Sequence, residues 1–87
     1  MTTNKPPRIY CDVNGRINER AYLPTHGTFE DLRKLGLTLA QALGKEFLLV
    51  MPDGNEELIA HGTVINDPEF GFLLEADEAG FQIRPRT

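Results

Sequence analysis

Four side chains near the start of the sequence could form a small binding surface. An arginine, an apolar residue and a tyrosine follow one another twice, as RIY at residues 8–10 and RAY at residues 20–22. If the two segments pair as a hairpin, the tyrosines and the arginines share its outward face. Such a face can stack on a base, pack a proline-rich peptide or pair with a second copy, although it also stabilises a hairpin without any ligand. The candidate binding residues are Arg8, Tyr10, Arg20 and Tyr22.

The rest of the sequence offers no catalytic constellation. It contains no serine, which excludes the serine hydrolases. Cys11 alternates with apolar neighbours, a pattern typical of a buried small hydrophobe and not of an exposed nucleophile. The glycines are spaced as helix ends and match neither a phosphate loop nor a dinucleotide fingerprint. We therefore predict a protein that is not an enzyme.

The sequence also predicts no metal or cofactor. The segment DVNGRINE resembles a calcium loop through Asp12, Asn14 and Glu19. A calcium loop needs its glycine at the sixth position, whereas Gly15 occupies the fourth. The two histidines are far apart in the sequence, and neither has a second ligand at zinc spacing.

Composition indicates one soluble globular domain. The chain has 87 residues, of which 40% are hydrophobic and 25% charged. We expect the domain to span residues 8–84, with flexible tails at 1–7 and 85–87. No apolar run approaches the roughly 20 residues of a membrane span, and the N-terminus lacks a secretory signal. We expect a cytoplasmic protein with no membrane contact and no small-molecule ligand.

Charge is distributed unevenly along the chain. Residues 1–45 hold seven Lys and Arg against four Asp and Glu, a net charge of +3, whereas residues 46–87 hold two against nine, a net charge of −7. This asymmetry favours a protein partner with its own charge pattern, or self-association, although solvated loops also account for it.

The N-terminal half is predicted to hold a hairpin and two short helices. Residues 8–13 alternate as a half-buried strand, Asn14-Gly15 is a turn signal, and a second strand ends before Pro24. A first helix is expected over residues 28–36 with Thr28 as its N-cap. Residues 38–44 repeat this pattern with a capping box.

The C-terminal half is predicted to hold four strands. Residues 46–51, EFLLVM, are apolar on both faces and should form the central, most buried strand. Turns at 52–55 and near Pro68 separate it from strands over 57–65 and 70–76, with a bulge or sharp coil at Gly62. A last strand should place Phe81 and Ile83 inward. The expected core comprises Phe47, Leu49, Val64, Phe72 and Leu74.

This order of elements predicts an α+β fold. We expect a small, strongly bent antiparallel sheet of about five strands, an SH3-like, partly open barrel, with one or two short helices inserted between strands 2 and 3. An open antiparallel sheet with the helices on one face is the alternative.

Residues 28–44 are also similar to the first part of a helix-turn-helix. A recognition helix should follow, but residues 47–51 belong in a core, and the net charge of −4 opposes phosphate contacts. Nucleic-acid binding, through this segment or through the arginine and tyrosine face, is therefore the alternative and not the favoured function.

Four segments of the chain resemble a family of short uncharacterised bacterial proteins. These segments are RIYCDVN, GTFEDLRKLGLTLAQALG, LLVMPDG and ELIAHGTV. The resemblance covers most of residues 8–76 and implies a stand-alone bacterial domain, without adding an activity. The function predicted from the sequence is a small interaction or adaptor domain that binds a protein partner or itself.

Overall fold

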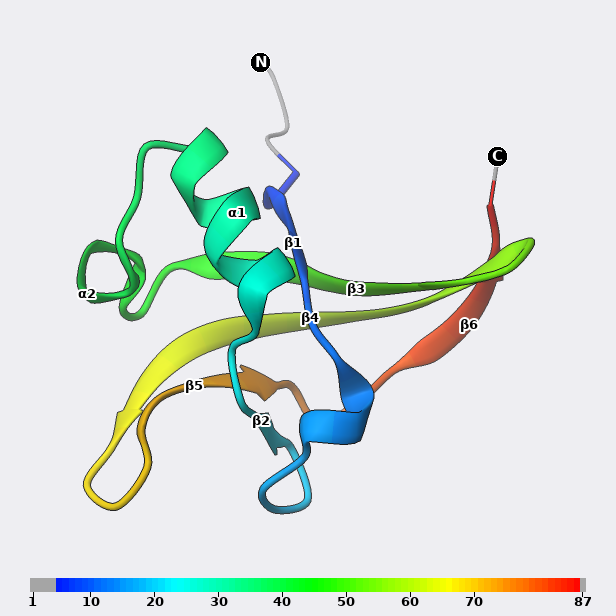
Figure 1. The fold of residues 1–87 in the computed structure, drawn as a ribbon. Helices are drawn as coiled ribbons and strands as arrows, with labels where there is room; N and C mark the ends of the chain where they lie inside the picture. The colour runs from blue at the N-terminus through cyan, green and yellow to red at the C-terminus, as the bar shows by residue number, and fades with distance from the viewer. Residues whose placement is uncertain (1–4, 87) are drawn as a thin grey trace.

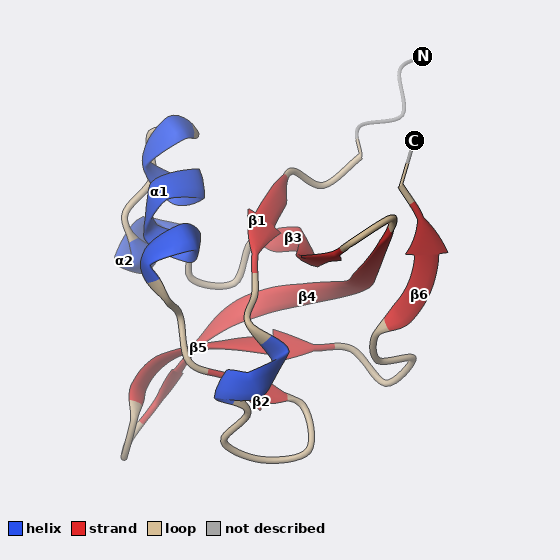
Figure 2. Cartoon of the chain, turned by 45° about the vertical axis from the view of Figure 1, so that its right-hand side comes forward, coloured by secondary structure: helices blue, strands red, loops and turns tan. Residues whose placement is uncertain are grey.

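The computed structural model describes residues 5–86 and contains one sheet with two short helices packed on one side of it (Figures 1 and 2). Residues 1–4 and 87, parts of the expected tails, lie outside the described residues. No helix within residues 5–86 has the length and apolar character that crossing a membrane requires. The elements are β1 (Arg8–Tyr10), a 3-10 turn (Val13–Gly15), β2 (Ala21–Tyr22), α1 (His26–Lys34), α2 (Leu39–Ala42), β3 (Glu46–Asp53), β4 (Glu56–Asp67), β5 (Gly71–Ala76) and β6 (Gln82–Pro85).

The six strands form a mixed sheet. Their order is β1-β3-β4-β5-β2, and β6 pairs with β4 beyond the end of β5. The α+β class and the insertion of two helices between the second and third strands are confirmed. The all-antiparallel sheet is wrong, because β1 runs parallel to β3. The sheet is not closed into a barrel, so the open arrangement with helices on one face describes it better.

The predicted N-terminal hairpin does not form. β1 pairs with β3, and β2 pairs with β5, so the two segments lie at opposite ends of the strand order. The Asp12 carboxylate accepts a hydrogen bond from the Asn14 amide at 2.9 Å and caps a 3-10 turn. A tight hairpin at Asn14-Gly15 needs positive φ at both residues, and neither adopts it. The chain therefore turns away, and each strand finds a longer, more apolar partner.

The free edges of the two outer strands are covered by the chain itself. The Tyr10 amide donates to the Asp31 carboxylate at 2.8 Å, and the Thr28 hydroxyl donates to the Tyr10 carbonyl at 2.7 Å. On β2, the Ala21 carbonyl accepts from the Ile17 amide at 2.8 Å. Unpaired strand edges invite pairing with other chains, and these bonds remove that possibility at β1 and β2.

The helices begin and end largely as their sequences predict. α1 begins after Thr25, three residues before the expected N-cap, because the Thr28 hydroxyl is buried against β1. α2 follows Thr38, whose side chain and backbone exchange hydrogen bonds with Gln41 at 3.2 and 3.0 Å. This capping box is confirmed. Gly36 follows α1 with a φ of +75°, a conformation that favours glycine.

The core lies between the helices and one face of the sheet. Leu32 of α1 and Ala42 of α2 join the buried residues of the strands. The expected core residues of β3, β4 and β5 are buried, with Phe72 partly so. The buried apolar residues of this cluster are Ile9, Cys11, Tyr22, Leu32, Ala42, Phe47, Leu49, Ala60, Val64, Leu74 and Ala76.

Three details of the C-terminal half differ from expectation. β4, and not β3, is the central strand, because it pairs with β3, β5 and β6. Gly62 keeps its register with both neighbours, so it is no bulge; a Cβ there would lie 2.5 Å from the Glu75 carbonyl oxygen. Phe81 packs against the core, but Ile83 is 65% exposed, because β6 extends past the part of the sheet that the helices cover.

Candidate functional site

The face of the sheet that the helices leave uncovered is the candidate functional site. Side chains alternate along β3 and β4, so the neighbours of the core residues point to the other side. There Leu48 lies opposite His61, and Thr63 lies opposite both Glu46 and Glu75. We call this surface the open face, and it comprises Glu46, Leu48, Ile59, His61, Thr63 and Glu75.

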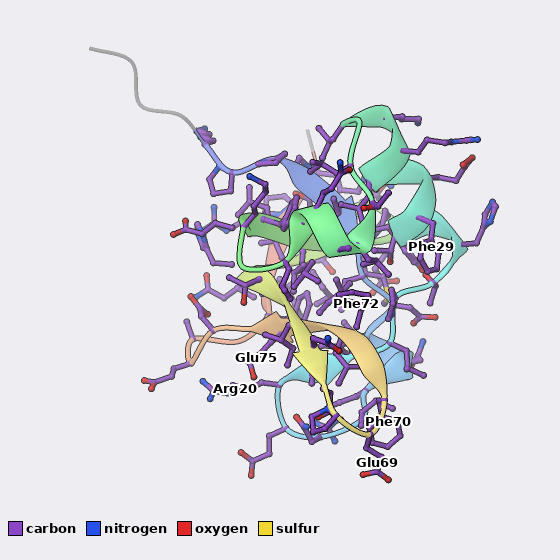
Figure 3. The ribbon with its side chains drawn as sticks, turned by 90° about the vertical axis from the view of Figure 1, so that its left-hand side faces the viewer. Arg20, Phe29, Glu69, Phe70, Phe72 and Glu75 are labelled. Atoms are coloured by element: carbon purple, nitrogen blue, oxygen red, sulfur yellow. The ribbon has the colours of Figure 1, made fainter. Side chains whose placement is uncertain are left out.

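One side of the open face is an acidic hollow of about 420 Å³. Four carboxylates and one guanidinium line it, which gives a net charge of −3 with His61 neutral. Its lining residues are Arg20, Glu46, His61, Gly62, Thr63, Glu75, Ala76, Asp77 and Glu78. Figure 3 shows Arg20 and Glu75 together on one side of the molecule, with the exposed Phe29 and Phe70 on the opposite side of that view.

The other side is a basic hollow of about 450 Å³. Lys5 and Arg84 bring positive charge to it, against the single carboxylate of Asp77. The half-buried side chains of Leu48 and Ile59 add apolar lining. Both hollows fall within the size range of ligand sites, roughly 300–1,000 Å³. They adjoin at His61 and Asp77, which line both.

The segment between β5 and β6 separates the two hollows. After β5 ends, the Asp77 amide still donates to the His61 carbonyl at 2.8 Å, which holds residue 77 against β4. The Asp77 carboxylate accepts from the Ala79 amide at 3.1 Å, and Gly80 turns the chain with a φ of +69°. β6 then rejoins the same edge of β4. Asp77 therefore lies at the junction of the two hollows, with its carboxylate hydrogen-bonded within its own loop.

Arg8 and Glu57 form an ion pair next to Arg84 of the basic hollow. Arg8 Nη2 lies 2.6 Å from Glu57 Oε1, and the Glu57 side chain is only 13% exposed. Glu57 is also the register partner of Arg84 on β6. Arg8 binds one oxygen of this carboxylate, and neither Arg84 nor Lys5 has an ion-pair partner within residues 5–86.

The structure does not bring the four predicted binding residues together. Arg20 lines the acidic hollow, and Arg8 lies in the ion pair with Glu57. The Tyr10 ring packs on the first turn of α1, where a Cβ at Gly27 would lie 2.8 Å from its Cδ2 atom. Tyr22 is 7% exposed and stacks edge-to-face on Phe81, with ring centroids 5.3 Å apart. The shared arginine and tyrosine face is therefore wrong, because it depended on the hairpin.

The other chemically interesting residues lie away from the open face. Burial raises the pKa of the Cys11 thiol to about 12, helped by the nearby charge of Asp12. Burial also raises the pKa of Tyr22. His26 begins α1 and is exposed. Across residues 5–86, no three His, Cys, Asp or Glu side chains are grouped so that they could hold a metal ion.

Sequence reasoning missed the two hollows because their residues come from separate segments. His61 lies exposed on β4, opposite Leu48. The polar residues that alternate with core residues in 56–65 were the available signal for an open face. Nothing local, however, indicates that Lys5 and Arg84, 79 residues apart, line one hollow.

The comparisons add no relatives. No family model, no curated protein and no solved structure matches this chain. The bacterial origin implied by the sequence resemblance stays a prediction. The geometry of the open face therefore indicates the function.

Proposed function

We propose that this chain is a non-enzymatic interaction domain that seats an extended segment of a protein partner on its open face. The observation that carries the proposal is the meeting of two hollows of opposite charge at His61. A peptide carries positive and negative side chains at short intervals, since an extended chain rises about 3.3 Å per residue. Charges arranged to complement a partner's charges give specificity and faster association.

The chemistry of the surface supports binding in place of catalysis. The chain has no serine, and its one cysteine is buried on the core side with a raised pKa. A thiol in that position is mostly protonated at neutral pH and inaccessible to a substrate. The open face instead offers half-buried apolar side chains between charged ones, an arrangement like that of protein interfaces.

A displayed library of random peptides tests the proposal. The library is selected against the wild-type chain, and the enriched peptides are then measured against His61→Arg. The longer arginine would obstruct both hollows at their junction. Ala40→Arg is the matched control, because Ala40 is exposed on α2, away from the open face. We expect the enriched peptides to bind the control as they bind the wild type and to lose at least about tenfold in affinity with His61→Arg, or 1.4 kcal/mol.

Several results would overturn the proposal. An absence of enriched peptides, or equal binding by both variants, would exclude this surface as a peptide site. A dimer that dissociates in His61→Arg would assign the face to self-association. Binding of a single-stranded nucleic acid that weakens steeply with salt and is lost in His61→Arg would replace the protein partner with a nucleic acid.

A further inference from the structure

We infer that the basic hollow binds a carboxylate carried on a short aliphatic stem, and that this group is the acidic anchor of the partner segment. The inference rests on the proposed function and names the chemistry of one of its two subsites. The carboxylate could belong to an aspartate or glutamate side chain or to a free carboxyl terminus. These two sources share the chemistry and are distinguished below by experiment.

The charge of the hollow is the first argument. Lys5 and Arg84 both line it, and neither has an ion-pair partner within the described residues. The nearest carboxylate by register, Glu57, is held by Arg8 at 2.6 Å. The remaining acid, Asp77, accepts a hydrogen bond from its own loop at 3.1 Å. An incoming anion therefore meets two cations whose charge the fold has not neutralised.

The apolar lining supplies the second argument. Leu48 and Ile59 are neighbouring open-face residues of β3 and β4, and both are half-buried at the basic hollow. A bare inorganic anion would leave these side chains without a contact. A carboxylate on two or three methylene or methyl groups would cover them, at about 25 cal/mol for each Å² of apolar surface removed from water.

The acidic hollow also restricts an anion to the basic side of the open face. Its net charge of −3 repels a carboxylate from the other side of His61. The same charge favours a cation there. The open face therefore gives a bound segment one orientation, with its acidic group over Leu48 and Ile59 and a basic group beyond His61.

Amide chemical shifts of the 15N-labelled chain of 87 residues test the inference without knowledge of the partner. The first probe is isovalerate, a carboxylate on a branched aliphatic stem, and its control is the neutral isovaleramide. We expect isovalerate to shift amide signals around the basic hollow and isovaleramide to leave them in place. Equal responses to both probes, or shifts located elsewhere, would overturn the inference.

Matched variants then assign the binding to the two cations. Lys5→Gln and Arg84→Gln each remove one positive charge from the hollow, and Lys34→Gln removes one from the exposed end of α1. We expect each hollow variant to weaken isovalerate binding about two- to fivefold, the range for exposed charge pairs, and the α1 variant to leave it unchanged. Equal affinity across all three variants would contradict the assignment. The spectra themselves report whether each variant is folded.

Two peptides distinguish the source of the carboxylate. One has a single glutamate and blocked ends, and the other has a free carboxyl terminus and no acidic side chain. The peptide that shifts the hollow signals at lower concentration identifies the source. If selected library peptides bind without any carboxylate, the anchor inference fails while the interaction function stands. If isovalerate binds but no library peptide does, the anion site stands and the peptide-binding function fails.

Discussion

Two adjacent leucines on β3 show how differently the two faces of this sheet are used. Leu49 lies opposite Ala60, belongs to the core cluster and is fully buried. Leu48 lies opposite His61 on the open face and keeps part of its surface in contact with solvent. On the core face, the helices and strands of the chain cover the apolar side chains, and the chain also hydrogen-bonds the free edges of β1 and β2. The open face retains unpaired charge and partly exposed apolar surface, so stability and binding are assigned to opposite sides of one sheet.

Replacing each of the two leucines with alanine should give the largest difference between the faces in the free energy of unfolding. Leu49→Ala should lower the free energy of unfolding by about 2–5 kcal/mol, because it leaves a cavity in a closed core. Leu48→Ala should cost no more than about 1.5 kcal/mol, since only half-buried surface is lost. Urea unfolding followed by circular dichroism measures both. Equal losses would show that the open face carries as much of the folding energy as the core.

Gly62 tests how closely the strands approach one another at the core face. A Cβ at this position would lie 2.5 Å from the Glu75 carbonyl oxygen and 2.6 Å from Leu49 Cδ1. We expect Gly62→Ala to destabilise the fold by about 1–3 kcal/mol through overpacking. Gly15→Ala is the control, because its Cβ would meet nothing closer than 3.7 Å. Similar unfolding midpoints for the two variants would mean that the sheet relaxes around Gly62.

These local constraints mark what the sequence could predict. The capping box of Thr38 and Gln41 depends on residues close together in the chain, and it is found. The turn expected over residues 52–55 is narrower than predicted, because Pro52 and Asp53 still pair with β4 and only Gly54 and Asn55 form the turn. The pairing of β1 with β3 depends instead on a competition between distant segments. Ile9 lies beside Leu49 and joins the core cluster, and no pattern within residues 8–23 indicates this pairing.

The candidate site was less predictable for the same reason. The basic hollow takes its lining from the segment before β1, from β3 and β4, and from the segment that ends in β6. Each segment looks like ordinary solvated sequence when considered alone. The uneven charge of the two halves was the only sequence feature that anticipated surfaces of opposite sign, and the strand order decides which charges meet.

Alkaline pH should lower the stability of the fold, because Cys11 is buried on the core face. The thiol ionises near pH 9.0 when unfolded, but burial raises its pKa to about 12 in the fold. The folded state therefore keeps a proton that the unfolded state loses, and stability falls as the pH rises from about 9 toward 12. The unfolding midpoint should differ less between neutral and alkaline pH in Cys11→Ala than it does in the wild type. An unchanged alkaline loss in that variant would assign the effect to other groups.

We expect Arg8→Met to have the smallest effect on stability. The same variant should separate the stability of the fold from binding at the open face most clearly. Arg8 is 54% exposed, so losing its ion pair with Glu57 should cost at most about 1 kcal/mol in urea unfolding. The substitution also frees Glu57 to pair with Arg84, its register partner. We expect isovalerate binding to weaken about two- to fivefold, since one cation of the basic hollow is then neutralised.

The double variant Arg8→Met/Glu57→Gln decides between this explanation and a general loss of structure. Without the Glu57 carboxylate, the register partner of Arg84 can no longer pair with it, so isovalerate binding should return to the wild-type affinity even though Arg8 is still absent. If Arg8→Met binds as the wild type does, the ion pair does not keep Arg84 available. If the double variant stays weak, Arg8 itself contacts the anion, and the hollow extends to β1.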